Sequence, residues 1–281
     1  MSVVKTSAEC MQTVCNIGGN KAKLPLVNSI IMGLLAGAYI GVGGFFAIKV
    51  AGNMPVAQWG NMTRLVFAMV FPVGLLSVLV AGADLFTGNC MYMPAAVMNK
   101  KTGLGGLTYN WSVSFVSNLI GSVCLAYFLG FMTNIFMDPD GSGFRPLAAY
   151  AVNLANGKTH LDFGVAFWRG VGCNWLVCLA VYMSLTASDG VSKAIVMWPP
   201  IACFVALGYE HSVANMTFIP LGIFIGQSQA YLATANVPAL TADWYGFFVT
   251  NLIPVTLGNI VGGMVFVAMF YYRGNGLKAE K

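Results

Sequence analysis

Charged side chains are the scarcest feature of this sequence. Only 8% of its 281 residues are Asp, Glu, Lys or Arg, whereas 58% are hydrophobic. A soluble globular protein carries about 25% charged residues, which it needs to cover its surface. The shortage excludes a soluble domain, a disordered chain and a nucleic-acid-binding protein. We therefore expect lipid to be the solvent for most of this chain, with the bilayer as its partner and no nucleic acid.

Patterns typical of metal and redox sites are also missing. The sequence has two histidines, His160 and His211, and its seven cysteines form no CxxC pair. This argues against a zinc site and a disulfide framework, and favours buried thiols that pack as small hydrophobes. A haem anchor would need axial ligands, and the two histidines are expected at different depths. With no nucleophile–base pair recognisable either, we expect no enzyme activity, no catalytic residue, no metal and no cofactor.

Long uncharged stretches mark the membrane spans, because a helix that crosses a bilayer needs about 20 apolar residues. Six stretches are long enough, and one of them is interrupted only by Glu210 and the neutral His211. They lie at 24–48, 65–83, 102–137, 170–188, 194–242 and 244–272. We expect an all-α membrane protein with six transmembrane helices within residues 27–272.

Basic residues predict the orientation of the spans, because cytoplasmic loops carry an excess of Lys and Arg. An even number of spans places residues 1–26 and the tail 273–281 on one side. Nine basic residues fall on that side: Lys5, Lys21, Lys23, Lys100, Lys101, Lys193, Arg273, Lys278 and Lys281. Five fall on the other: Lys49, Arg64, Arg145, Lys158 and Arg169. Both termini are therefore predicted to be cytoplasmic, in a multi-pass protein of the cytoplasmic membrane.

The first 26 residues are polar and contain no apolar core followed by a small-residue cleavage site, so we expect no signal peptide. Apolar residues recur there at helical spacing, at Val4, Ala8, Met11 and Cys15. The spacing predicts a short amphipathic helix on the membrane face. An ordinary frayed terminus is the alternative.

A motif of the form G-x-[DE]-x4-N-x4-P occurs twice, at an offset of 126 residues. One copy begins at Gly82 and the other at Gly208. A second echo pairs Asn-Leu-Ile-Gly from Asn118 with Asn-Ile-Val-Gly from Asn259. Residues 27–136 and 161–272 are therefore predicted to be two halves of three spans each. Because three is odd, the second half starts on the opposite side of the membrane, and the repeat is inverted, as in many transporters.

The repeated motif predicts a break in the second and in the fifth span. Glycine, short acids, asparagine and proline are poor residues for a continuous helix, and broken spans are where transporters place their substrate sites. We expect the acids to fix the breaks by accepting hydrogen bonds from loop backbone, rather than to contact substrate. The residues assigned to the two loops are Asp84, Asn89, Glu210 and Asn215. Two kinked helices without a pore are the alternative.

His211 stands apart from the repeat, because its counterpart at the same offset is Leu85. Symmetry therefore does not require a histidine there. We expect it to lie beside the second break, within hydrogen-bonding reach of Thr87 in the partner loop. Imidazole exchanges protons near neutral pH, which predicts a functional role over that of an ordinary core histidine.

Four segments resemble the formate/nitrite transporter family. They are Ala-Asp-Leu-Phe-Thr-Gly at 83–88, Cys-Asn-Trp-Leu-Val-Cys-Leu-Ala at 173–180, Gly-Tyr-Glu-His-Ser-Val-Ala-Asn-Met at 208–216 and Asn-Leu-Ile-Pro-Val-Thr-Leu-Gly-Asn at 251–259. The resemblance runs from about residue 27 to residue 272. It implies a homopentamer in which each protomer is an aquaporin-like, six-span pore with broken second and fifth helices. It also implies transport of small monovalent anions.

The same resemblance implies roles for individual residues. It places Thr87 and His211 at the central site, with Asn174 nearby. It makes Lys158 a vestibule lysine, which would concentrate anions. It further implies that two hydrophobic constrictions are formed by Phe71, Leu75, Phe86 and Phe204. Apolar rings exclude hydrated ions by dewetting, so a neutral species is favoured at the narrowest point.

These observations predict a channel or transporter that moves formate together with a proton. Nitrite, hydrosulfide or another small monovalent anion is the alternative within the family, because such ions differ little in size and charge. A channel for small neutral solutes is a more distant alternative. It is disfavoured because the Asn-Pro-Ala repeats of aquaporins are missing.

Overall fold

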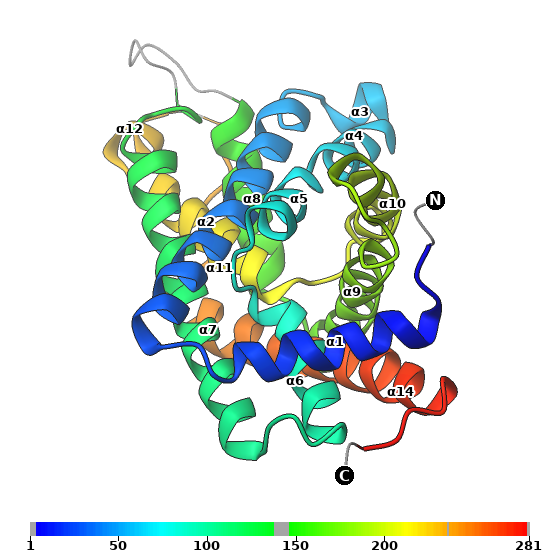
Figure 1. Ribbon diagram of the computed structural model, residues 1–281. Coiled ribbons are helices and arrows are strands. Elements are labelled where there is room, and N and C mark those ends of the chain that lie inside the picture. Colours follow the sequence, from blue (N-terminus) through cyan, green and yellow to red (C-terminus); the bar gives the residue numbers. More distant parts are fainter. Residues whose placement is uncertain (1–3, 138–145, 235, 280–281) are drawn as a thin grey trace.

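The computed structural model describes residues 4–137, 146–234 and 236–279. Two basic residues counted in the predicted orientation, Arg145 and Lys281, lie outside the described residues. The described chain is helical and contains no strand (Figure 1). Its first half comprises α1 (Ser7–Lys21), α2 (Leu26–Ala51), α3 (Val56–Trp59), α4 (Met62–Val70), α5 (Val73–Ala81), α6 (Phe86–Met98), α7 (Leu104–Cys124) and a π-helical continuation, Leu125–Phe131.

The second half repeats much of this order. It comprises α8 (Pro146–Thr159), α9 (Phe163–Ser184), α10 (Gly190–Ala206), α11 (Ser212–Gly226), α12 (Gln229–Leu232), π-helical Gly246–Leu252, α13 (Ile253–Gly263), π-helical Met264–Met269 and α14 (Phe270–Gly274). Five stretches are long and apolar enough to cross a membrane: Leu26–Ala51, Met62–Ala81, Leu104–Phe131, Phe163–Ser184 and Gly246–Gly274. These helices make the chain a membrane protein. The segment predicted as the fifth span is divided between α10 and α11, which are shorter.

The first interruption falls on the first copy of the repeated motif. Helix α5 ends at Ala81, and α6 begins at Phe86. Between them Gly82 has a φ of 82°, in the left-handed region, which costs a glycine little and other residues more. A Cβ at this position would meet nothing within 4 Å. Backbone conformation, not space, is therefore what requires the glycine.

The second interruption falls on the second copy in the same way. Helix α10 ends at Ala206, and α11 begins at Ser212. Gly208 has a φ of 72°, again with nothing within 4 Å of an added Cβ. His211 is the N-cap of α11. Both copies thus end one helix with a left-handed glycine and start another within a few residues.

Helix α1 is the short helix that the apolar spacing predicts near the N-terminus, and its apolar face packs on the rest of the chain. It lies across the α6 end of the molecule, beside α14 (Figure 1). Val4 is exposed, whereas Met11 and Cys15 are fully buried. At Gly18 an added Cβ would come within 2.2 Å of the Tyr92 carbonyl oxygen. The apolar face of α1 is therefore covered by α6 of the same chain, because small residues let the two backbones approach closely.

The glycine faces of the long helices are used inside the protomer. A Cβ at Gly37 of α2 would lie 2.2 Å from the Asn118 carbonyl oxygen of α7, and one at Gly258 of α13 would lie 2.2 Å from the Phe167 carbonyl oxygen of α9. Such small-residue contacts are the usual way in which membrane helices pack closely. They hold α2 against α7 and α9 against α13.

Candidate functional site

The two interruptions meet at a hydrogen bond between Thr87 and His211. The hydroxyl oxygen of Thr87, in the first turn of α6, lies 3.0 Å from Nε2 of His211, at the start of α11. Both side chains are buried. The sequence predicted this pair, and the structure brings it together from residues 124 positions apart.

The second ring nitrogen of His211 is also engaged. The backbone N–H of Ala214 donates to Nδ1 over 3.0 Å, so His211 occupies the place that Ser or Asp usually takes at a helix N-cap. Because a backbone N–H only donates, Nδ1 is the acceptor. In the neutral imidazole the proton is then on Nε2, which donates to the Thr87 hydroxyl. The cap therefore sets both the tautomer and the direction of the ring.

The backbone of Thr87 is held by α9. Asn174 donates from Nδ2 to the Thr87 carbonyl over 3.0 Å and to the Asn259 carbonyl over 2.7 Å. The thiol of Cys178 lies 3.3 Å from the same Thr87 oxygen. Asn174 was predicted to lie near the central site, and its amide donates to main-chain carbonyls rather than to the side chains of Thr87 and His211. Cys178 was not singled out, because nothing in its spacing points to Thr87.

Aromatic rings surround one side of the histidine. Phe204 of α10 stacks on the His211 ring, with centroids 5.9 Å apart and an interplanar angle of 23°. Phe71, at the end of α4, meets Phe204 edge to face at 6.0 Å. Leu75 of α5 is buried. The fourth residue assigned to the constrictions, Phe86, is buried and packs against the α7 aromatic residues, with the Phe115 ring centroid at 5.1 Å.

Glu210, directly before the histidine, is the centre of a charged network. Nζ of Lys158 lies 3.0 Å from each of its carboxylate oxygens. Asn215 donates to the same carboxylate over 2.7 Å, and Asn251 lies 3.5 Å from it. Burial of an acid in a membrane protein is costly unless it is paired in this way.

Asp84 has the same surroundings in the first interruption. It forms an ion pair with Lys21 of α1, accepts from Asn89 over 2.9 Å, and accepts from Asn110 over 3.3 Å. The asparagine five residues after each acid, Asn89 or Asn215, thus plays the same part in both copies. The lysines and the α7 and C-terminal asparagines were not predicted as loop partners.

Backbone groups of the two loops are held by a second pair of asparagines, and this corrects the role expected for the acids. Asn118 accepts from the Phe86 N–H over 2.9 Å and donates to the Asp84 carbonyl over 3.0 Å. Asn259 accepts from the Ser212 N–H over 2.9 Å and donates to the Glu210 carbonyl over 3.0 Å. Asn118 and Asn259 thus already accept the backbone N–H groups of the loops. The carboxylates of Asp84 and Glu210 therefore bind lysines and the amides of other asparagines.

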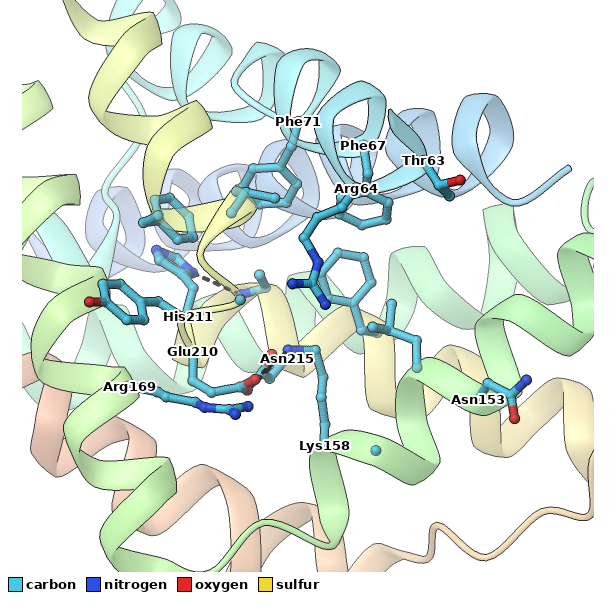
Figure 2. A pocket seen from close by; sticks show the side chains of 18 of the residues that line it. Thr63, Arg64, Phe67, Phe71, Asn153, Lys158, Arg169, Glu210, His211 and Asn215 are labelled. Atoms are coloured by element: carbon cyan, nitrogen blue, oxygen red, sulfur yellow. Dashed lines mark hydrogen bonds and ion pairs between the residues drawn. The ribbon is translucent and has the colours of Figure 1, made fainter. Parts of the chain in front are cut away.

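A cavity of about 430 Å³ opens beside the second interruption and reaches His211 (Figure 2). We call it the vestibule. Its walls come from α4, α8, α9, α10 and α11. Its lining includes Phe71, Phe204 and His211 at the inner end and, as polar residues, Asn61, Thr63, Arg64, Tyr150, Asn153, Lys158, Arg169, Tyr209, Glu210 and Asn215. The described residues contain no cluster of His, Cys, Asp or Glu that could hold a metal ion.

Comparison with known proteins identifies the family. Residues 8–273 match the profile described as formate/nitrite transporter. The chain is 46% identical over 280 residues to a "Probable formate transporter" of Methanothermobacter thermautotrophicus, covering 96% of this chain and 97% of that protein. It is 34% identical over 263 residues to the "Formate channel FocA" of Escherichia coli, covering 91% and 89% of the two chains.

Solved structures agree with these relatives. A "Pentameric formate channel with formate bound" superposes with a TM-score of 0.76 at 34% identity, covering 88% of this chain and 96% of the other. An "FNT family ion channel" superposes with a TM-score of 0.80 at 30% identity, covering 95% and 98%. The family consists of membrane channels and transporters rather than enzymes. The chain is therefore a membrane transport protein of the formate/nitrite transporter family.

Proposed function

We propose that this chain forms a channel that moves formate, together with a proton, in both directions across the cytoplasmic membrane. The observation that carries the proposal is the buried contact between Thr87 and His211 at the meeting point of two interrupted helices. The names of two relatives, a probable formate transporter and a formate channel, and of the solved pentameric formate channel support the choice of substrate.

The proposed path runs from the vestibule to the Thr87–His211 pair. An anion enters past Lys158 and reaches the constriction of Phe71 and Phe204, where the ring of His211 also borders the vestibule. A bare carboxylate between two phenyl rings has lost its water and gained no partner, which is costly. Formate therefore takes up a proton from His211, which stacks on Phe204 at the inner end of the vestibule, and crosses the ring edges as neutral formic acid. We place the second constriction, with Leu75 and Phe86, on the other side of the pair.

Proton co-transport follows from this step, because each crossing of formic acid carries one proton. His211 is the proposed exchange site. For the imidazole to pass its Nε2 proton to formate, Nδ1 must take up another proton, and it must then release the Ala214 N–H. Nδ1 therefore cannot accept the Ala214 N–H while it carries a proton for transfer. The ratio of protons to formate transported by a His211 variant separates these two roles.

The architecture we propose is six spans in two inverted halves, 27–136 and 161–272, with broken second and fifth helices. The repeated contacts support it. Asp84, Asn89, Asn110 and Asn118 in the first half correspond to Glu210, Asn215, Asn251 and Asn259 in the second, and the lysines that pair with the two acids, Lys21 and Lys158, each precede their half. We further propose that residues 1–26 and 273–281 are cytoplasmic. A homopentamer is supported by the solved relative, described as pentameric.

The test is flux in proteoliposomes that contain the purified protein and a trapped pH dye. Formate added outside is expected to enter and to acidify the lumen, and vesicles without protein give the background. Nitrite entry without formate entry would replace formate by nitrite as the substrate. Swelling in urea or glycerol without any response to anions would instead favour a channel for neutral solutes.

A further inference from the structure

The charges that line the vestibule do not balance. Among the residues that the structure describes, three basic residues contribute to its wall, Arg64, Lys158 and Arg169, and one acid, Glu210. Lys158 is committed to that acid, with Nζ 3.0 Å from both carboxylate oxygens. Its side chain is also largely buried. The excess positive charge of the vestibule therefore belongs to the two arginines.

Arg64 projects its guanidinium into the cavity. Arg64 lies in α4, and Phe67 and Phe71 follow it by three and seven residues. At this spacing the three side chains share one helix face. Seven residues of helix place Arg64 about 10 Å from Phe71 along the axis. Figure 2 shows the guanidinium of Arg64 directed from this face into the cavity, above Lys158. The charge thus precedes the apolar constriction on the same helix.

Arg169 approaches from the other side, on α9. Its carbonyl oxygen accepts the Glu210 N–H over 3.2 Å, which ties its backbone to the second interruption. Its side chain lies beside Glu210 in Figure 2. Within the described residues neither Arg64 nor Arg169 forms an ion pair, and neither side chain donates a hydrogen bond. Two guanidinium groups of one cavity are therefore free to bind an anion.

We propose that Arg64 and Arg169 form a capture site in the vestibule for a carboxylate or another small, flat monoanion. A guanidinium presents its N–H groups as a fork that matches two carboxylate oxygens, and it keeps its charge at every relevant pH. A concave, partly apolar wall focuses that charge. Lys158 has a different task here, since it neutralises Glu210. The identity of the anion as formate rests on the proposed function, whereas the site itself rests on the two arginines.

Residue-resolved chemical modification of the pentamer or monomer in mild detergent tests this site without transport. Phenylglyoxal, which reacts with guanidinium groups, is applied at low ionic strength, and each arginine is followed by peptide mass spectrometry. Arg64, Arg169 and Arg273 are all exposed, so all three react in the absence of anion. Sodium formate is expected to slow the reaction of Arg64 and Arg169 several-fold and to leave Arg273, on α14, unaffected. Formamide, a neutral molecule of similar shape, gives no protection.

If formate slowed the modification of Arg273 equally, ionic screening alone would explain the effect and the proposal would be wrong. The proposal would also be wrong if formate did not slow the modification of Arg64, or if Arg64 did not react at all. A variant tests whether the two arginines act together. In Arg64→Gln, protection of Arg169 by formate falls several-fold; unchanged protection contradicts a shared site. Formate flux without protection disproves the capture site alone. Protection without flux in the wild-type protein contradicts the proposed function and leaves the site standing.

Discussion

His211 carries the proton-coupling hypothesis at the scale of single residues. His211→Asn retains a side chain that can cap α11, because Asn is a good N-cap residue, but it removes the titratable ring. We expect formate movement in this variant to lose its proton, leaving either an anion current or a blocked pore. The measurement is the ratio of protons to formate in proteoliposomes. A wild-type ratio would instead make His211 a hydrogen-bonding fixture of the loop.

Thr87 separates the hydrogen bond from the proton. Thr87→Val keeps the shape of the side chain but leaves the Nε2–H of His211 without its acceptor at 3.0 Å. A buried donor without a partner costs about 1–3 kcal/mol. We expect slower formate flux with an unchanged proton ratio. An altered ratio would show that the hydroxyl itself takes part in proton transfer.

The Lys158–Glu210 ion pair is predicted to matter for stability. In Glu210→Gln the amide still accepts from Asn215, but Lys158 is left largely buried without a counter-charge. Breaking a buried pair from one side costs about 3–5 kcal/mol. We expect a clear fall in the melting temperature in detergent, and its recovery in the double variant with Lys158→Met. Asp189→Asn, which removes an exposed acid, is the control and should melt like the wild type.

Helix α1 offers a prediction at the scale of elements. Its first turn is held by a capping box in which Thr6 and Glu9 exchange hydrogen bonds. Those bonds to Thr6 hold the pKa of the Glu9 carboxyl below its usual value. A lowered pKa means that the carboxylate stabilises the turn above the ordinary pKa of a glutamate, and that this stabilisation is lost as the pH falls through the lowered value.

Amide hydrogen exchange measures this effect. We expect the first turn of α1 to exchange faster in Thr6→Ala at neutral pH, and the wild type to approach the variant in acid. The last turn of α1, near Gly18, serves as the internal reference, because it packs on Tyr92 in both proteins. Identical exchange in the two proteins at neutral pH would show that packing on α6, and not the cap, holds the first turn.

The spacing of the helices explains which features of the repeat the sequence could predict. The breaks after Ala81 and Ala206 were predictable, because acid, asparagine and proline recur at one constant offset of 126 residues. The lysine partners are 137 residues apart and the α7 and C-terminal asparagines are 141 apart. Connections of different length in the two halves change the offset from element to element. A gapless comparison therefore finds the loops and misses Lys21, Asn110 and Asn251.

Contacts between side chains were harder to predict than positions along the chain. The pairing of Thr87 with His211 was predictable because both flank a break. The ion pair between Lys158 and Glu210 was not predictable, because a lysine that precedes a span is usually a solvated charge. Only the fold brings its Nζ to 3.0 Å from the Glu210 carboxylate. The arginines of the vestibule were counted only for orientation, because nothing in their spacing places them in one cavity.

At the scale of the whole molecule, the proposed pentamer would form through surfaces other than the glycine faces of α2 and α13. The glycines of α2 and α13 pack against α7 and α9 of the same chain. Large apolar side chains remain exposed on the single protomer, among them Ile31 and Phe46 of α2. In a membrane such faces contact lipid or a neighbouring protomer. Native mass spectrometry in mild detergent is expected to give five copies, and a stable tetramer or monomer would contradict this.

Gly37→Val distinguishes packing within the protomer from packing between protomers. Its side chain would meet the Asn118 carbonyl at 2.2 Å, so α2 would have to move away from α7. Asn118 also holds the first interruption through the Phe86 N–H and the Asp84 carbonyl. We expect a loss of folded protein rather than release of intact monomers. Gly105→Ala, where an added Cβ meets nothing within 4 Å, should assemble normally. Folded Gly37→Val monomers with wild-type helix content would place this glycine face between protomers.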